Sequence, residues 1–264
     1  MKKSPLFSVM GHTVCIVFCA ILMYPLVVML SKSLRNNGLG NYLRVFREVD
    51  ILPNFRTSLI VVFGTLLLVT MVTSMAAFAF SKLNFPGRDL IYFILLSAMM
   101  VPTAAILFPL FFIVRGLHLI NTPWALVFPY VTLNAVFNLL ILKNFFDSFP
   151  KELMEAATID GANTFGIYFR IMMPISMPGL SIVLIQTFLS AWNELQMGMT
   201  FINRPKLQPI SVVPLRFVQQ TVTATYPIEV MYASLVICLL PIALFYICAQ
   251  KFLVRGLSAG AIKG

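Results

Sequence analysis

The feature that most constrains this 264-residue chain is a set of long stretches without Asp, Glu, Lys or Arg. Each stretch exceeds the roughly 20 residues that a helix needs to cross about 30 Å of hydrocarbon. A backbone inside a bilayer must satisfy its own hydrogen bonds, so each stretch is expected to be helical. The sequence therefore predicts an all-α polytopic membrane protein with six transmembrane helices. The uncharged stretches are residues 4–31, 57–81, 90–114, 116–142, 171–193 and 230–250.

The composition agrees with this prediction and leaves no room for a separate soluble domain. Hydrophobic residues make up 59% of the chain and charged residues 11%, whereas soluble domains carry about 25% charge. We therefore expect one transmembrane domain over residues 1–264, with a connecting loop at 147–172 and a tail at 251–264. The expected spans are about 9–31, 57–80, 90–114, 121–142, 175–202 and 229–250.

Neither the net charge nor the cysteines indicate a further function. The net charge is +10, but the 19 basic residues are scattered through loops between the apolar stretches. Loop charge beside membrane helices explains this pattern better than nucleic-acid binding does. The four cysteines lie inside predicted spans and give no disulfide framework. His12, Cys15 and Cys19 share one helical face, but one helix supplies too few ligands for a metal site, and none is expected.

Two long connections join predicted spans on one side of the membrane. In residues 32–56, Tyr42, Val45 and Phe46 share a helical face, which predicts a short helix at the membrane interface. Residues 203–229 are expected to be irregular and extended because prolines recur in them. These prolines are Pro205, Pro209, Pro214 and Pro227.

The connection between the fourth and fifth spans is polar in an otherwise apolar chain. Four of the nine acidic residues fall within 14 positions, which are Asp147, Glu152, Glu155 and Asp160. Pro150 suits the first turn of a helix, and Gly161 can take the left-handed conformation that ends one. Asn163 can cap a second helix that runs toward Arg170. Residues 152–178 are therefore expected to form two short helices that meet at a corner outside the bilayer.

This corner suits close contact with a partner protein. Ala156 and Ala157 have almost no side chain, so a partner surface can approach the backbone there. Glu155 and Asp160 supply charge, and a charge-assisted hydrogen bond contributes about 1.5–3 kcal/mol. An ordinary amphipathic helix lying on the membrane is the alternative.

The spacing E-A-A-x-x-D-G-A, followed by Ile171, Pro174 and Pro178, resembles the cytoplasmic coupling loop of ABC-importer permeases. Other motifs match the carbohydrate-uptake branch of that family, of the maltose-permease G-subunit type, in the same order. They are Met100-Val101-Pro102, Pro109-Leu110-Phe111, Asn121-Thr122, Phe128-Pro129-Tyr130, Phe145-Phe146, Pro150-Lys151-Glu152-Leu153, Trp192-Asn193-Glu194 and the ending from Gly256 to Gly264.

The resemblance implies a six-span type I importer fold and a non-enzymatic subunit. The implied partners are a second homologous permease subunit, an ATPase dimer that holds ATP and Mg, and an extracytoplasmic solute-binding protein. The chain itself lacks G-x-x-x-x-G-K-[ST], the usual phosphate-binding loop. The resemblance also places the chain in a bacterial or archaeal cell membrane with both termini cytoplasmic, whereas the ten against nine basic residues on the two sides do not discriminate. The implied substrate is a sugar or oligosaccharide, with glycerol phosphate or another polyol as the alternative.

Within the loop, the resemblance assigns ATPase coupling to Glu155, Ala156, Ala157, Asp160 and Gly161. It also implies that the tail inserts into the ATPase dimer interface, the alternative being a flexible end. The glycines at 256, 260 and 264 would leave one narrow helical face. The tail residues expected to touch the ATPase are Gly256, Leu257, Gly260 and Lys263.

Polar residues inside two predicted spans are candidates for the substrate path. Glu194 is costly within a bilayer and should face a cavity or a partner helix. Trp192 could stack on a sugar ring and Asn193 could bind hydroxyl groups, or all three could fix helix packing. Asn134 and Asn138, one turn apart, could line the path or bond to a neighbouring helix.

Two other classes of membrane protein are less consistent with the sequence. A secondary transporter would usually show inverted repeats and paired charges near the midplane. A membrane enzyme would need converging acids, a metal set or a nucleophile with its base, and Glu194 alone is a candidate.

Overall fold

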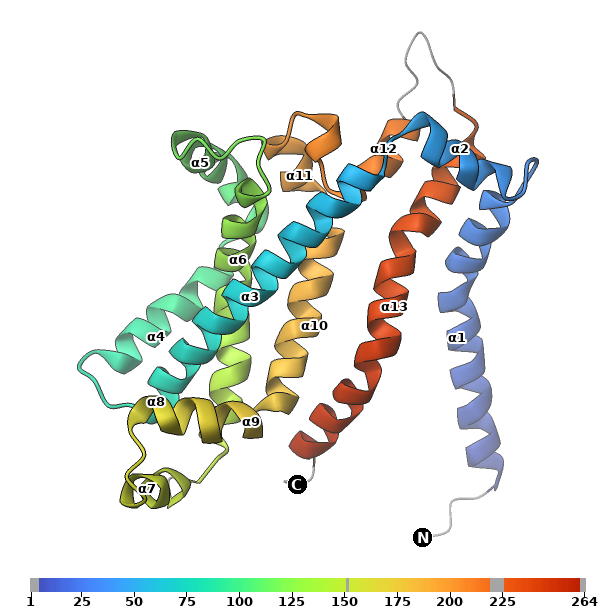
Figure 1. Cartoon of the computed structure of the whole chain (residues 1–264). Helices are drawn as coiled ribbons and strands as arrows, with labels where there is room; N and C mark the ends of the chain where they lie inside the picture. The colour runs from blue at the N-terminus through green and yellow to red at the C-terminus, as the bar shows by residue number, and fades with distance from the viewer. Residues whose placement is uncertain (1–4, 151, 219–225, 262–264) are drawn as a thin grey trace. The chain divides into compact units, whose positions relative to one another are not determined.

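The computed structural model describes residues 5–150, 152–218 and 226–261, with side chains for 10–150, 152–218 and 226–250. All regular elements in this part of the chain are helices (Figure 1). The predicted all-α fold class is confirmed. Contacts divide the chain into two compact units, Met1–Ile51 with Val213–Pro241 and Leu52–Val212 with Ile242–Gly264.

The first unit contains α1 (Pro5–Ser33), α2 (Gly40–Glu48), α12 (Val213–Val218) and the first part of α13 (Ile228–Ala261). The short helix predicted around residues 41–46 is present as α2, which contains Asn41 and Tyr42. Asn41 donates from Nδ2 to the carbonyl oxygens of Ser33 and Arg35, both at 2.9 Å. The hydroxyl oxygens of Ser33 and Tyr42 are 2.6 Å apart. These contacts fix α2 against the end of α1.

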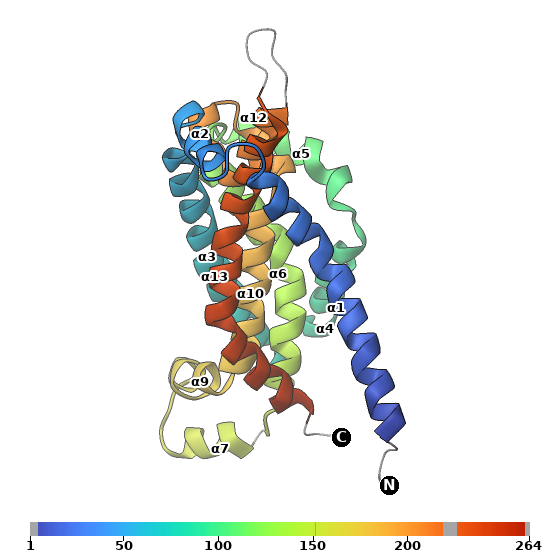
Figure 2. The same cartoon turned by 90° about the vertical axis from the view of Figure 1, so that its right-hand side faces the viewer.

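The second unit is built around α3 (Leu52–Lys82), α6 (Trp124–Asp147) and α10 (Met177–Asn193). The three helices run side by side in both views (Figures 1 and 2). Asn138 of α6 donates from Nδ2 to Oγ1 of Thr187 in α10 at 2.9 Å. A Cβ on Gly179 would lie 2.7 Å from the Phe145 ring, so α10 can approach α6 this closely only because residue 179 is glycine.

The expected span 90–114 is not one helix. It is divided into α4 (Arg88–Ser97), the 3-10 turn η1 (Ala98–Met100) and α5 (Thr103–Gly116), with a bend of 104°. The cause is Pro102, which disfavours helical backbone in the residue before it. Val101 is extended, with φ −83° and ψ 118°.

The expected span 175–202 is also interrupted. α10 ends at Asn193, Glu194 is extended with φ −66° and ψ 123°, and α11 (Gln196–Phe201) follows. The prediction of irregular extended structure for residues 203–229 was wrong in part: Arg204 and Gln208 are extended, but short helical elements lie between and after them. There the chain forms η3 (Pro205–Leu207), η4 (Ile210–Val212) and α12, because proline also suits the first turn of a helix.

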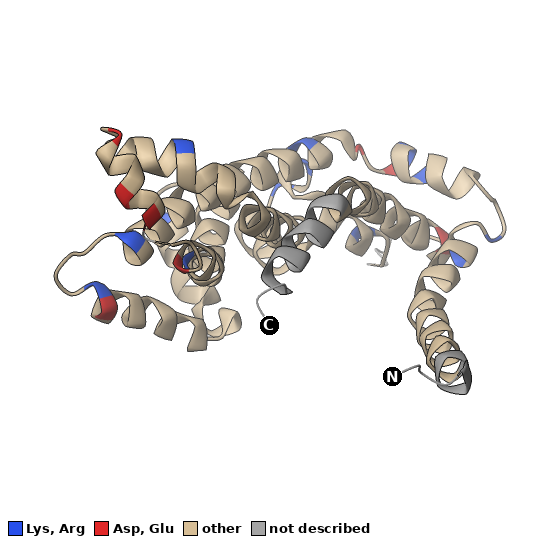
Figure 3. Ribbon diagram, turned by 90° about the horizontal axis from the view of Figure 1, so that it is seen from below, with Lys and Arg blue, Asp and Glu red and all other residues tan. Residues whose placement is uncertain are grey.

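Four helices of the described chain are long and apolar enough to cross a membrane, and two bent pairs bring the number to six if each is one span. The four are Met10–Ser33, Leu52–Lys82, Trp124–Asp147 and Ile228–Gln250. Most of the ribbon seen from below carries neither acidic nor basic residues (Figure 3). Exposed apolar side chains along α1 are consistent with lipid as its solvent.

Candidate functional site

The polar connection between α6 and α10 consists of short helices that lie across the end of α10. They are α7 (Glu152–Ile159), α8 (Thr164–Ile167), the π-helical turn η2 (Tyr168–Met172) and α9 (Met173–Ile175). The axis of Thr164–Ile175 is bent by 76° from that of α10 (Figure 1). We call residues 152–175 the connecting segment.

The corner of the connecting segment has the local structure that its residues predict. Gly161 has φ +81°, which an L side chain rarely adopts. The N–H of Ala162 donates to the carbonyl oxygen of Ala157 at 2.9 Å, which closes the end of α7. Asn163 accepts from the N–H of Gly166 on Oδ1 at 2.8 Å and caps α8.

Four of the five residues assigned to ATPase coupling form an exposed surface at this corner. Glu155, Ala156, Asp160 and Gly161 are exposed. Ala157 is instead buried, with 7% of its surface exposed, within the core that contains Phe146. Its small side chain therefore lets α7 pack on this chain, which differs from the expected contact with a partner.

The inner face of the connecting segment is anchored to α3. The Tyr168 hydroxyl lies 2.6 Å from Oγ of Ser74, and its ring lies 5.4 Å from the ring of Phe78 between centroids. Ile167 and Met172 are buried in the same core cluster. A displacement of the segment is therefore opposed by packing against α3 and α6.

The connecting segment also exposes large apolar side chains that the sequence analysis did not single out, Ile159 of α7 and Phe165 of α8, of which Phe165 lines a small pocket against α3. The exposed fraction is 86% for Ile159 and 65% for Phe165. Their position on either side of the Asp-Gly corner was the available signal. Exposed apolar residues of this kind mark a surface that contacts a protein or a membrane.

An open groove of about 540 Å³ runs between α7 and the end of α3. Glu155 and Ile159 line one side, and Lys82 and Arg88 are on the other. The groove thus combines both signs of charge with apolar surface, which suits a protein side chain better than a simple ion.

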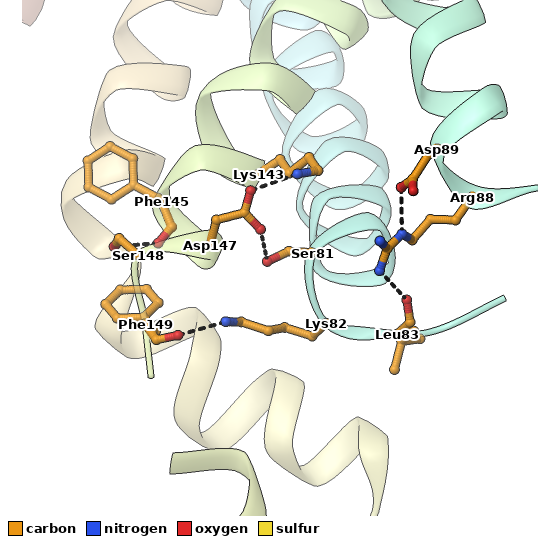
Figure 4. Close-up of polar contacts among 10 residues, drawn as sticks. All are labelled: Ser81, Lys82, Leu83, Arg88, Asp89, Lys143, Phe145, Asp147, Ser148 and Phe149. Atoms are coloured by element: carbon orange, nitrogen blue, oxygen red, sulfur yellow. Dashed lines mark hydrogen bonds and ion pairs between the residues drawn. The ribbon is translucent and has the colours of Figure 1, made fainter. Parts of the chain in front are cut away.

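Several polar contacts connect the ends of α3 and α6 beside this groove (Figure 4). Asp147 accepts from Ser81 Oγ on Oδ1 and from Lys143 Nζ on Oδ2, both at 2.6 Å. Lys82 donates from Nζ to the carbonyl oxygen of Phe149 at 2.8 Å. The acidic cluster that includes Asp147 was recognised in the sequence analysis, but these partners from α3 were not.

Trp192, a candidate for the substrate path, is buried in this structure with 2% of its surface exposed. Its ring stacks on Phe188 with 5.7 Å between centroids and lies 6.3 Å from the ring of Phe55. The indole is thus buried beside two aromatic side chains, which favours the packing interpretation over stacking on a sugar.

Glu194 and Asn193 lie at the break between α10 and α11. Glu194 Oε1 accepts from the N–H of Met197 at 2.8 Å, and its carbonyl oxygen accepts from Ser211 Oγ at 2.7 Å. The carboxylate therefore caps the start of α11, at the break itself. Asn193 is exposed and donates from Nδ2 to Leu189 O within its own helix at 3.0 Å.

Asn134 and Asn138 differ in their partners. Asn134 is half-buried and donates from Nδ2 to the Tyr130 carbonyl oxygen of its own helix at 2.8 Å. Asn138 is fully buried and bonds to Thr187 of α10. Asn138 thus has the helix-bonding role that was one of its two interpretations.

At the opposite end of the second unit, side-chain amides hold the turns after α11. Asn54 donates from Nδ2 to the carbonyl oxygens of Pro205 at 2.8 Å and Gln208 at 2.6 Å. Asn121 accepts on Oδ1 from the N–H of Asn203 at 2.7 Å. The sequence analysis did not single out Asn54, and quoted Asn121 only as part of a motif.

In the tail, α13 continues as a helix through Gly256, Leu257 and Gly260, beyond the span end expected at residue 250. Lys263 lies outside the described residues.

Comparison with known proteins identifies the family. Residues 70–259 match the family described as "Binding-protein-dependent transport system inner membrane component". The chain is 33% identical over 228 residues to the "Trehalose/maltose transport system permease protein MalG" of Thermococcus litoralis, which covers 86% of this chain and 81% of the relative. It is 28% identical over 273 residues to the "Diacetylchitobiose uptake system permease protein NgcG" of Streptomyces coelicolor, with 97% and 89% covered.

The fold has a solved counterpart. A chain of a bacterial ABC transporter involved in the import of the acidic polysaccharide alginate superposes with a TM-score of 0.82 at 20% identity, covering 95% of this chain and 98% of that one. The family match covers most of the chain, from the middle of α3 into α13, and includes the whole connecting segment. This chain therefore belongs to the family of binding-protein-dependent transport system inner membrane components.

Proposed function

We propose that this chain is one permease subunit of an ATP-driven importer that takes up a sugar or oligosaccharide. It forms half of the translocation path with a second, homologous permease subunit. An ATPase dimer, which binds ATP and Mg, docks on the connecting segment, and a solute-binding protein delivers substrate on the other side. Both termini then lie in the cytoplasm.

The observation that carries this proposal is the two-sided construction of the connecting segment. Its outer face exposes Glu155, Ala156, Asp160 and Gly161, together with the apolar Ile159. Its inner face is buried against α3 and α6 through side chains such as Tyr168. A partner that grips the outer face can therefore move the membrane helices behind it.

The family membership supports dependence on a binding protein, and the described relatives support the sugar class. One relative is named for trehalose and maltose and another for diacetylchitobiose, and both are transport permeases. Closure of the ATPase dimer would draw the connecting segments of the two permease subunits together. The helices would then change from an inward-facing to an outward-facing arrangement, and sugar would enter from the binding protein.

We also propose that the tail after α13 reaches into the ATPase dimer interface. The spacing of Gly256 and Gly260 gives one narrow face to the helix, which can enter a cleft. Deletion from Gly256 onward should leave insertion of the spans normal and weaken co-purification of the ATPase or sugar uptake. Unchanged values of both would contradict this role.

The complex isolated from native membranes, reconstituted in proteoliposomes, tests the main proposal. ATP-dependent uptake is measured for maltose, trehalose, diacetylchitobiose and glycerol 3-phosphate, with the binding protein present. We expect uptake of a sugar, whereas uptake of glycerol 3-phosphate alone would support the polyol alternative. Transport by this chain without an ATPase would contradict the proposal.

Two substitutions test the coupling surface. Glu155→Lys reverses its charge, and Gly161→Leu places a side chain where φ is +81°. Both should insert normally and lose ATPase association and uptake. Normal association in both variants would overturn the assignment of this surface.

A further inference from the structure

The ends of α3 and α6 are joined by polar contacts at the point where the chain leaves α6 for α7. Ser81 and Lys82, the last two residues of α3, donate to Asp147 and to the carbonyl oxygen of Phe149. The bonded residues are 66 and 67 positions apart in the sequence. These contacts therefore connect two helices and are not local capping (Figure 4).

Asp147 is the centre of these contacts. Its Oδ1 accepts from Ser81 in α3, and its Oδ2 accepts from Lys143, one turn back in α6. The Lys143 ammonium also lies 5.0 Å from the ring centroid of Tyr92 in α4. One carboxylate thus takes donors from two helices, and its lysine partner reaches a third.

Lys82 contacts the short linker between the end of α6 at Asp147 and the start of α7 at Glu152. Phe149 immediately precedes Pro150, and α7 begins at Glu152. Because Lys82 Nζ holds the Phe149 carbonyl oxygen at 2.8 Å, α3 is bonded to the last residues before α7. Lys82 also lines the groove that Glu155 of α7 shares.

We propose that Lys82 and Asp147 are positioning residues that make α3 and α6 follow α7 as one body. This inference rests on the proposed function, in which a partner moves α7. Without the Lys82 contact, movement of the linker would reach α6 through the chain. It would reach α3 only indirectly, through packing, the Ser81–Asp147 bond from α6 and the Ser74–Tyr168 bond farther along the connecting segment. With it, both helices are bonded at the point where the movement enters the membrane.

An ordinary structural role predicts something different. If the contacts only stabilise the helix ends, removing them should lower stability and change nothing in how α7 and α3 move. The test must therefore report on relative movement during the ATP cycle. Distances between spin labels on α7 and α3 give this readout and need no knowledge of the transported sugar.

The experiment uses the whole complex in lipid nanodiscs. The four cysteines of this chain are first replaced, so that only the introduced positions are labelled. Labels are placed at Leu153 of α7 and Met75 of α3, which are both exposed and are not assigned to the ATPase contact. The label-to-label distance is measured by pulsed electron paramagnetic resonance with ADP and with ATP plus vanadate. In the native sequence we expect one distance in both states.

In Lys82→Met, the population at the native label-to-label distance should fall roughly fivefold with ATP plus vanadate. Fivefold is at the lower end of the coupling factors usually found between two sites in a protein. Lys82→Arg keeps a donor and should restore the native distance. Lys206→Met removes one positive charge from η3, at the opposite end, and should behave as native. Ser81→Ala, which removes one of the donors to Asp147, gives a second and smaller loss of the native distance.

Three results would overturn the inference. They are a native distance that itself changes with ATP, a Lys82→Met variant that keeps the native distance, and a loss in Lys82→Met that Lys82→Arg does not restore. If Lys82→Met fails to insert, Ser81→Ala decides alone, and an unchanged distance in it also overturns the inference. Failure of the proposed function is detected separately, as normal ATPase association in Glu155→Lys and Gly161→Leu.

Discussion

The Tyr168 hydroxyl lies 2.6 Å from Oγ of Ser74, a residue 94 positions earlier in the chain. Ser74 directs its single hydroxyl hydrogen at the carbonyl oxygen of Thr70, one turn back in α3. The proton of the contact therefore belongs to Tyr168, which donates to Ser74. This bond fixes η2 of the connecting segment to a membrane helix.

Replacing Tyr168 by Phe should remove this hydrogen bond and retain the ring packing against Phe78. The expected cost is about 0.5–1.5 kcal/mol in the free energy of unfolding, the net value of an ordinary hydrogen bond. It is measured by SDS titration in mixed micelles. In a double-mutant cycle with Ser74→Ala, the two losses should not add. Additive losses would show that the two hydroxyl groups do not interact.

Gly179→Ala tests the close approach of α10 to α6. The added Cβ would lie 2.7 Å from Phe145 Cγ, near the base of that side chain, so a rotation of the ring cannot remove the overlap. Overpacking of this kind costs about 1–3 kcal/mol. Unfolding in mixed micelles should show the loss.

Gly11→Ala is the matched control for this substitution. Gly11 lies in α1, and nothing is within 4 Å of its Cβ position. Ala at this helical position should leave stability equal or slightly higher. Equal losses at both positions would attribute the effect to removing glycine and not to the Phe145 contact.

Glu194 can be tested as a cap separately from its charge. Glu194→Gln keeps an oxygen that can accept from Met197, whereas Glu194→Ala removes it. We expect near-native stability for Gln and a loss of about 1 kcal/mol for Ala, the usual value of a helix cap. If Gln instead abolishes sugar uptake while stability is kept, the charge itself serves the path. Unfolding and uptake are measured on the same preparations.

The sequence predicts those parts of the fold that hydrocarbon and local backbone chemistry impose. Long uncharged stretches must be helical in a bilayer, and α3 and α6 follow from that rule. The corner at Gly161 and the cap at Asn163 are local signals and are found where their residue types place them. Pro102 was also a local signal for the break at Val101, but one continuous span was expected because residues 90–114 carry no charge.

Features that depend on the packed structure could not be read in the same way. Whether Ala157 faces a partner or its own core depends on how α7 rotates against α3 and α6. Trp192 was a candidate for stacking on a sugar, but the structure places the rings of Phe188 and Phe55 beside it. The Lys82 contact needs two ends that are 67 residues apart, and no pattern in a single sequence gives that pairing.

Asn54 should keep the turns that follow α11 in their folded structure. Its amide donates to two backbone carbonyl oxygens, those of Pro205 and Gln208, from one buried position at the start of α3. Asn54→Ala removes both bonds, so the carbonyl oxygens of Pro205 and Gln208 each lose a hydrogen-bond donor. Amide hydrogen exchange of residues 203–212 should become faster, since exchange follows local opening.

Asn193→Ala is the control, because that amide bonds only to Leu189 O in the contacts described, within its own helix. Unchanged exchange in Asn54→Ala would mean that other contacts hold these turns without Asn54. Among them are Asn121 Oδ1, which accepts from the N–H of Asn203, and Ser58 Oγ, which accepts from the N–H of Ile210.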